Sequence, residues 1–257
     1  MIAELLTRCR QGYRTVAFPP ADPKLSDRFR GCPSVDASKC ASDCRSCQAV
    51  CPVQALERDA AGLLRLDLGE CLFCRNCENA CPQKAIRFSQ DYRLAARKRE
   101  DLMLTPGGTL CLAQALDEKT RKLFGRSLKL RQVSAGGCNA CEADTNVLNT
   151  LVFDLGRFGV QFVASPRHAD GLLVTGPVTE NMREALKQTY DALPSPRLVI
   201  AVGSCAISGG PYKGQAEAHD GAGRLLPVDL FVPGCPPHPF TILDGLLRLL
   251  GRLEKQS

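Results

Sequence analysis

The chain has 257 residues, 44% of them hydrophobic and 23% charged, which is the composition of a globular protein of one or two domains. No apolar stretch approaches the roughly 18 residues that a bilayer-spanning helix needs, so we expect a chain that is soluble or held at a membrane by partner proteins. The formal charge of +6 counts each of the fifteen cysteines as a neutral thiol, so it does not by itself indicate a nucleic-acid partner.

The N-terminal stretch has only a short apolar run before Arg8 and lacks a cleavage site, so we expect no signal peptide. In the reducing cytosol, cysteine-dense spacing is typical of metal binding rather than of disulfides. The chain is therefore expected in the cytoplasm with its cysteines reduced.

An internal repeat occupies the next part of the chain. The segment CASDCRSCQAVCPVQAL at 40–56 aligns with CLFCRNCENACPQKAI at 71–86, and the first copy carries one extra residue in its opening gap. Both copies end in Cys-Pro, where proline fixes the backbone after the last cysteine. Between the copies, Gly62 predicts a turn that joins two short strands.

The repeat has the spacing C-x3-C-x2-C-x3-C-P followed by C-x2-C-x2-C-x3-C-P, and residues 30–90 resemble the bacterial-type ferredoxins with two [4Fe–4S] clusters. In such ferredoxins the fourth ligand of each cluster comes from the other run. Zinc is the alternative, but it prefers four ligands from two separated pairs. We therefore expect two crossed ligand sets, namely Cys40, Cys44, Cys47 and Cys81 for the first cluster and Cys71, Cys74, Cys77 and Cys51 for the second.

Residues 93–127 are interpreted as a connector between a domain at 1–92 and a domain at 128–257. The basic run that includes Arg93, Arg97 and Arg99 is expected to form a solvated helix face, and Thr105-Pro106-Gly107-Gly108 breaks the chain after it. A helix is expected over 110–125.

From residue 128 onward, strand and helix patterns alternate. Short apolar or β-branched runs predict strands at 128–133, 171–175, 198–202 and 229–232. Helical spacing of apolar residues predicts helices over 147–158, 182–193 and 240–253, the last packed against the core. Strands that alternate with helices imply a parallel α/β sheet.

Four further cysteines follow three of these strands. Cys138 and Cys141 follow the first, Cys205 follows the third and Cys235 follows the fourth. The carboxyl ends of parallel strands form the ligand crevice of an open α/β sheet, so we expect these thiols to hold a third [4Fe–4S] cluster. Alternatives are a thioredoxin-like pair at Cys138 and Cys141, with the other two as buried thiols. Twelve cluster thiolates and three oxidised cores of about +2 each bring the net charge to about zero, which leaves no case for nucleic acid.

This half also resembles a known family through SAGGCNACEAD, SPRHADGLLVTGPVTENMREAL, VIAVGSCAISGGPY and VPGCPPHP. Residues 128–250 are similar to the small subunit of membrane-bound, energy-converting [NiFe] hydrogenases and to the related subunit of complex I, which implies a flavodoxin-like domain. The complex I form has adjacent cysteines at the first position, whereas Cys138 and Cys141 are separated as in the hydrogenases. The hydrogenases usually have a glutamate three residues after the second cysteine, where this chain has Asp144, with Glu142 beside the cysteine. Their proton-handling role is therefore not carried over.

The first half, including FRGCPSVDASKC, resembles the separate ferredoxin-like subunit of formate hydrogenlyase-type complexes, so the chain looks like a fusion of two subunits. The resemblance implies an electron-transfer subunit on the cytoplasmic face of the inner membrane, held there by membrane subunits. Its expected partners are a [NiFe] hydrogenase-like large subunit and a further iron–sulfur or formate dehydrogenase subunit. No catalytic acid, base or nucleophile is identified in the chain.

Two other interpretations remain open, a complex I-like ferredoxin or quinone oxidoreductase subunit without nickel and a free-standing soluble electron carrier. Some residues belong to neither cysteine pattern. Cys9, Cys32 and Cys111 are expected to be free thiols, and His168, His219 and His238 are too scattered for a metal site.

Overall fold

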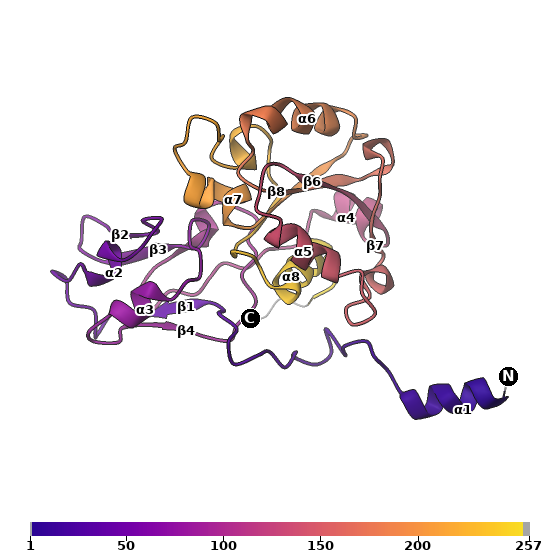
Figure 1. Cartoon of the computed structure of the whole chain (residues 1–257), viewed down its shortest axis with the longest axis horizontal. Coiled ribbons are helices and arrows are strands. Elements are labelled where there is room, and N and C mark those ends of the chain that lie inside the picture. Colours follow the sequence, from indigo (N-terminus) through magenta and orange to yellow (C-terminus); the bar gives the residue numbers. More distant parts are fainter. Residues whose placement is uncertain (1, 254–257) are drawn as a thin grey trace.

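The computed structural model describes residues 2–253. A ferredoxin-like half lies beside an α/β half, and helix α1 (Ile2–Gln11) extends away from both, exposed along its length (Figure 1). Within residues 2–253, no helix is both long and apolar enough to cross a membrane.

The ferredoxin-like half consists of short antiparallel strands and two short helices. Strand β1 (Pro33–Val35) pairs with β4 (Ile86–Phe88), and β3 (Leu64–Asp67) lies between β2 (Leu56–Arg58) and β5 (Met103–Leu104). Helices α2 (Ser46–Ala49) and α3 (Asn76–Ala80) each follow a cysteine loop. The turn expected at Gly62 is confirmed, with a φ of +78° and an N–H that donates to Asp59 O at 2.9 Å.

The segment between the halves packs into both of them. Ala96 and Phe231 exchange backbone hydrogen bonds of 3.0 and 2.9 Å, which extends the edge of strand β10 (Leu230–Val232). The expectation of a solvated helix at the basic run was wrong, because residues 97–99 form a bend and the side chains of Arg97 and Arg99 have partners within the protein. Arg97 donates to Asp229 O at 2.8 Å, and Arg99 pairs with Asp67 at 2.6 Å.

The helix expected over 110–125 is also shorter than predicted. After the 3₁₀ turn η1 (Glu100–Leu102), the next helix is α4 (Glu118–Phe124). Asp117 caps α4 by accepting from Thr120 N at 3.0 Å, so the helix begins there. The preceding residues 111–117 form neither a helix nor a strand, and Ala113 and Leu116 among them are buried.

The α/β half has the predicted parallel sheet. The order is β10-β9-β8-β6-β7, built from β6 (Leu128–Ser134), β7 (Val160–Phe162), β8 (Gly171–Thr175), β9 (Leu198–Val202) and β10. This is the flavodoxin-like order, and neighbouring strands run parallel. The four predicted strands are confirmed, whereas β7 was not foreseen.

Helices cover both faces of this sheet (Figure 1). Because side chains alternate along a strand, Ile200 joins the core under α5 (Ala140–Val147) and α8 (Pro239–Leu249), while Val199 joins the core under α6 (Glu180–Asp191). Helix α7 (Ser204–Ser208) faces the ferredoxin-like half. Short 3₁₀ turns complete the half, at η2 (Leu155–Phe158), η3 (Pro166–His168), η4 (Gly210–Tyr212) and η5 (Ala222–Arg224).

The helix expected over 147–158 was wrong. Helix α5 ends at Val147, and turns lead from there to η2. Leu151 and Val152 have the spacing of a buried helix face, yet they are 79% and 44% exposed. The expected helices over 182–193 and 240–253 correspond to α6 and α8.

Candidate iron–sulfur sites

The first group of thiols surrounds a single cavity. Cys40, Cys44, Cys47 and Cys81 line about 220 Å³ of space, together with apolar side chains such as Leu64 and Ile86. Cys81 reaches this cavity from the second run, after helix α3, while the other three come from the first run. The structure therefore brings together the crossed set that the spacing predicts.

The second group gathers around the buried thiol of Cys71. Burial, followed by the nearby thiols of Cys77, Cys51 and Cys74, raises the pKa of Cys71 to about 12, while the Phe73 N–H opposes the shift. Cys51 of the first run thus lies with three cysteines of the second run. Such thiols give up their protons only to a strong competitor, and iron–sulfur clusters bind the thiolate form.

Backbone N–H groups point at several of these sulfur atoms. Phe73 N lies 3.3 Å from Cys71 Sγ, Ala55 N lies 3.3 Å from Cys51 Sγ, and Ala85 N lies 3.2 Å from Cys81 Sγ. These donors stabilise negative charge on sulfur. The donor set fits a thiolate-bound, negatively charged group.

The third group lies at the carboxyl edge of the parallel sheet. Cys138 and Cys141 follow β6, Cys205 follows β9 and Cys235 follows β10. Burial raises the pKa of Cys141, and the charges of Cys205, Glu142, Cys235 and Cys138 add to the effect. Cys138 and Cys235 are exposed, so this group opens to the surface.

Gly203 allows the third group to close. Its φ is +90°, and a Cβ at this position would lie 2.5 Å from Cys141 Sγ. A side chain there would displace the thiol, so glycine is required both for the backbone conformation and for space.

The three groups follow one another in space. Cys47 of the first group packs in one buried cluster with Cys71 and Cys77 of the second group. Cys74 of the second group contributes, after burial and Cys138, to the raised pKa of Cys235 in the third group. The second group therefore lies between the other two.

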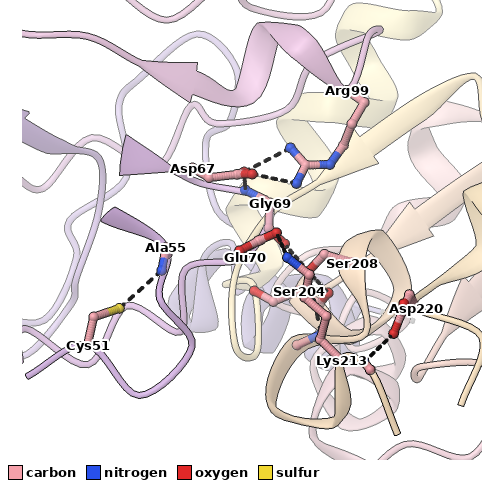
Figure 2. Close-up of polar contacts among 12 residues, drawn as sticks. Cys51, Ala55, Asp67, Gly69, Glu70, Arg99, Ser204, Ser208, Lys213 and Asp220 are labelled. Atoms are coloured by element: carbon pink, nitrogen blue, oxygen red, sulfur yellow. Dashed lines mark hydrogen bonds and ion pairs between the residues drawn. The ribbon is translucent and has the colours of Figure 1, made fainter. Parts of the chain in front are cut away.

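Hydroxyl groups of α7 hold the second and third groups together across the junction. Ser204 Oγ donates to the carbonyl of Cys71 at 2.6 Å, and Ser208 Oγ donates to the carbonyl of Gly69 at 2.9 Å. Figure 2 shows these serines beside the ion pair of Lys213 with Glu70. The sequence did not single out Ser204, although it directly precedes Cys205.

The remaining candidates do not form a further site. Within residues 2–253, no three Cys, His, Asp or Glu side chains lie close enough together to bind one metal ion directly, and this includes the cysteines of the three groups; those of the first group are instead spaced around a cavity of about 220 Å³. Cys9 and Cys111 are exposed, and burial with help from Asp91 raises the pKa of the Cys32 thiol to about 11. His168, His219 and His238 lie on separate elements.

Two acidic residues flank the third group. Glu142 is buried and accepts hydrogen bonds from Ser134 Oγ at 2.6 Å and Thr175 Oγ1 at 2.5 Å. Burial raises the pKa of Asp144. These two hydrogen bonds fix the Glu142 carboxylate to strands β6 and β8.

Comparisons with known proteins agree with this division. Residues 138–249 match the family described as NADH ubiquinone oxidoreductase, 20 Kd subunit, and residues 32–82 match the 4Fe-4S dicluster domain. A probable membrane-bound hydrogenase subunit of Pyrococcus furiosus is 44% identical over 52% of this chain and 80% of its own length. A subunit of the NADH-quinone oxidoreductase of Phocaeicola vulgatus is 40% identical over 60% of this chain and 77% of its own length.

Formate hydrogenlyase subunit 7 of Escherichia coli is also 40% identical, over 52% of this chain, and this chain spans 53% of that protein. Among solved structures, a chain of the membrane-bound sulfane sulfur reductase, an archaeal respiratory membrane complex, is 32% identical with a TM-score of 0.45. That match covers 55% of this chain and 78% of the other.

Proposed function

Because the chain belongs to the family of the NADH:ubiquinone oxidoreductase 20 kDa subunit, here preceded by a 4Fe-4S dicluster domain, we propose that it is the electron-transfer subunit of a membrane-associated [NiFe] hydrogenase of the energy-converting, formate hydrogenlyase type. It relays electrons through three [4Fe–4S] clusters to or from a catalytic large subunit. The chain itself is a subunit of a redox complex and carries no catalytic acid or base in this proposal.

The observation that carries the proposal is the spatial order of the three thiol groups. Cys47 of the first group packs in the same buried cluster as Cys71 and Cys77 of the second, and Ser204, which precedes Cys205 of the third group, donates to the Cys71 carbonyl at 2.6 Å. When bound, [4Fe–4S] clusters accept and release single electrons. An unbroken line of such sites across both halves supports a relay rather than separate structural metals.

The residues of this chain hold, shield and tune the clusters. Eight thiols of the ferredoxin-like half would bind the first two clusters, and Cys138, Cys141, Cys205 and Cys235 would bind the third. The hydroxyl of Ser204 fixes the second site against the third, since it joins the Cys71 carbonyl to the residue before Cys205. We propose 1–92 and 128–257 as the two domains, with 93–127 as a connector that packs into both.

The surface position of the third group supports a covering partner. Cys138 and Cys235 are exposed, and a large subunit that lies over them would bring its own redox centre close. Further iron–sulfur or formate dehydrogenase subunits would meet the ferredoxin-like half. Membrane subunits would hold the whole complex at the cytoplasmic face of the inner membrane. The name of the Pyrococcus furiosus relative, a membrane-bound hydrogenase subunit, supports the membrane association.

A second candidate is a complex I-like ferredoxin or quinone oxidoreductase subunit without nickel. The NADH-quinone oxidoreductase relatives favour it, because their identity to this chain is similar to that of the hydrogenase relatives. Cys138 and Cys141, separated by two residues, favour the hydrogenase form.

Anaerobic purification of the complex from its own cells tests the proposal. We expect a large subunit with bound nickel to copurify, together with about twelve iron atoms and about twelve sulfides per copy of this chain. Mass spectrometry and metal analysis provide both measurements. A complex with full iron and no nickel-bearing subunit would favour the complex I-like candidate, and a monomeric chain that retains its iron alone would favour a free-standing carrier.

A further inference from the structure

The two copies of the cysteine repeat differ at one position beside the clusters. The copies align with a shift of 30 residues, as Cys44 with Cys74 shows. The same shift superimposes β2 on β4, so Arg58 at the end of β2 corresponds to Phe88 at the end of β4. A permanent positive charge in one copy is replaced by an apolar ring in the other.

The guanidinium of Arg58 is held inside the first cysteine loop. Its Nη2 donates to the carbonyls of Ala41 at 2.8 Å and Cys44 at 2.9 Å, and lies 3.5 Å from Cys40 Sγ. Its Nη1 donates to the carbonyl of Gly62 at 2.6 Å. Arginine stays charged at any pH that proteins tolerate, so this position carries a fixed cation.

One donor of Arg58 has no partner in the protein. Its Nε is buried, and among residues 2–253 it meets no hydrogen-bond acceptor. The same side chain lines the cavity that Cys40, Cys44, Cys47 and Cys81 surround. A buried N–H without an acceptor is unfavourable, and an occupant of the cavity with sulfur acceptors would supply one.

The second copy has Phe88 at the corresponding position. Arg30 does reach its cysteine loop and donates to the Phe73 carbonyl at 3.1 Å, but among residues 2–253 it makes no hydrogen bond to a cysteine sulfur, as Arg58 does to Cys40. Phe88 packs edge-on against Phe73 of the second cysteine loop, with ring centroids 6.3 Å apart. The copies also differ at Gln48 and Glu78, which align by the same shift. Glu78 forms an ion pair with Arg75, whereas Gln48 is neutral and donates to Leu56 O at 3.3 Å.

We propose that Arg58 raises the reduction potential of the first cluster above that of the second. The proposal rests on the proposed function, since it takes both sites to hold [4Fe–4S] clusters. Reduction adds a negative charge, which a nearby cation and N–H donors stabilise, and cluster potentials follow net charge and hydrogen bonds to sulfur. At equilibrium, an electron within the ferredoxin-like half would then occupy the first cluster more often than the second.

The test is a redox titration of the full-length, cluster-loaded chain, followed by electron paramagnetic resonance. In Arg58→Gln, the midpoint of the first cluster should fall by at least the equivalent of a tenfold change in its reduced-to-oxidised ratio, about 59 mV for one electron. The other two midpoints should stay in place. Arg58→Lys, which keeps the charge without the planar fork, should retain most of the wild-type potential.

Phe88→Arg is the matched variant in the other copy, and its second cluster should move to higher potential. Iron and sulfide analysis accompanies each titration. If Arg58→Gln keeps its iron and its midpoint, the proposal is overturned. If Arg58→Gln loses iron because the loop opens, Phe88→Arg decides, and an unmoved second midpoint overturns the proposal. A wild-type chain that binds no iron would instead overturn the proposed function.

Discussion

The two halves of the molecule hold their cysteines in opposite ways. In the ferredoxin-like half the thiols come from contiguous runs, and Cys47, Cys71 and Cys77 are part of the buried core. In the α/β half the thiols lie on loops beyond a sheet whose strands β8 and β9 are buried along their length. The thiols of the ferredoxin-like half are therefore part of its core, so bound metal would complete that core. The α/β half has a complete core of aliphatic side chains, and its thiols lie outside that core, at the edge of the sheet.

Removal of the iron should have the largest effect, and it should affect the two halves differently. Metal-binding free energy is folding free energy where a site forms part of the core, so the iron-free chain should lose its ordered ferredoxin-like half. Strands β8 and β9 should remain folded, because aliphatic side chains surround them. Hydrogen exchange before and after anaerobic chelation measures this. Equal loss of protection in both halves would contradict the comparison.

Gly203→Ala should empty the third site alone. The added Cβ would lie 2.5 Å from Cys141 Sγ, so we expect about four of about twelve iron atoms to be lost while the ferredoxin-like half keeps its share. Gly62→Ala is the matched control, because Gly62 also has a positive φ, of +78°, but its nearest neighbour would be 3.9 Å away. The control should cost about 1–2 kcal/mol of stability without iron loss. Full iron content in Gly203→Ala would refute the steric argument.

Ser204→Ala should weaken the junction between the halves. The substitution leaves the buried Cys71 carbonyl without its 2.6 Å donor, which costs about 1–3 kcal/mol. Urea unfolding of the cluster-loaded chain measures the loss. Ser34→Ala removes an exposed 3.4 Å bond to Arg87 O and should change stability by less than about 0.5 kcal/mol. Equal effects of the two substitutions would show that the buried hydroxyl has no special role.

Lys213→Met should have the smallest effect. Lys213 pairs with Glu70 across the same junction, but its side chain is 51% exposed, and such pairs contribute up to about 1 kcal/mol. The contribution should disappear at high salt. Lys122→Met, which breaks an exposed pair with Glu118 far from the junction, provides the reference. A loss as large as that of Ser204→Ala would mean that charge rather than buried hydroxyls joins the halves.

Much of the fold was predictable because the signals were local. The runs at 171–175 and 198–202 are continuous and apolar since both faces of a parallel sheet are covered, and both strands are confirmed. The crossed grouping of Cys51 and Cys81 followed from the repeat, and the structure places each with the opposite run. Their role as cluster ligands stays a prediction.

The errors arose where tertiary contacts override periodicity. Leu151 and Val152 keep helical spacing, but the chain turns after Val147 and leaves both exposed. The basic run is not helical because Ala96 pairs with Phe231, a partner far away in the sequence, and a bend follows at 97–99. Arg58 was missed for a different reason, since its role appears only when the two copies of the repeat are compared beyond their cysteines.

The packing between the halves also limits whether the ferredoxin-like half can be exchanged for another ferredoxin. Ala95 packs so closely on α8 that a Cβ at Gly245 would lie 2.7 Å from its side chain, and Ala96 completes an edge of the sheet. A ferredoxin that is a separate subunit can be exchanged for another with a different partner. In this chain Phe18 and Tyr92, which lie within residues 1–92, also belong to the core of the α/β half, so exchange of the ferredoxin-like half would remove part of that core.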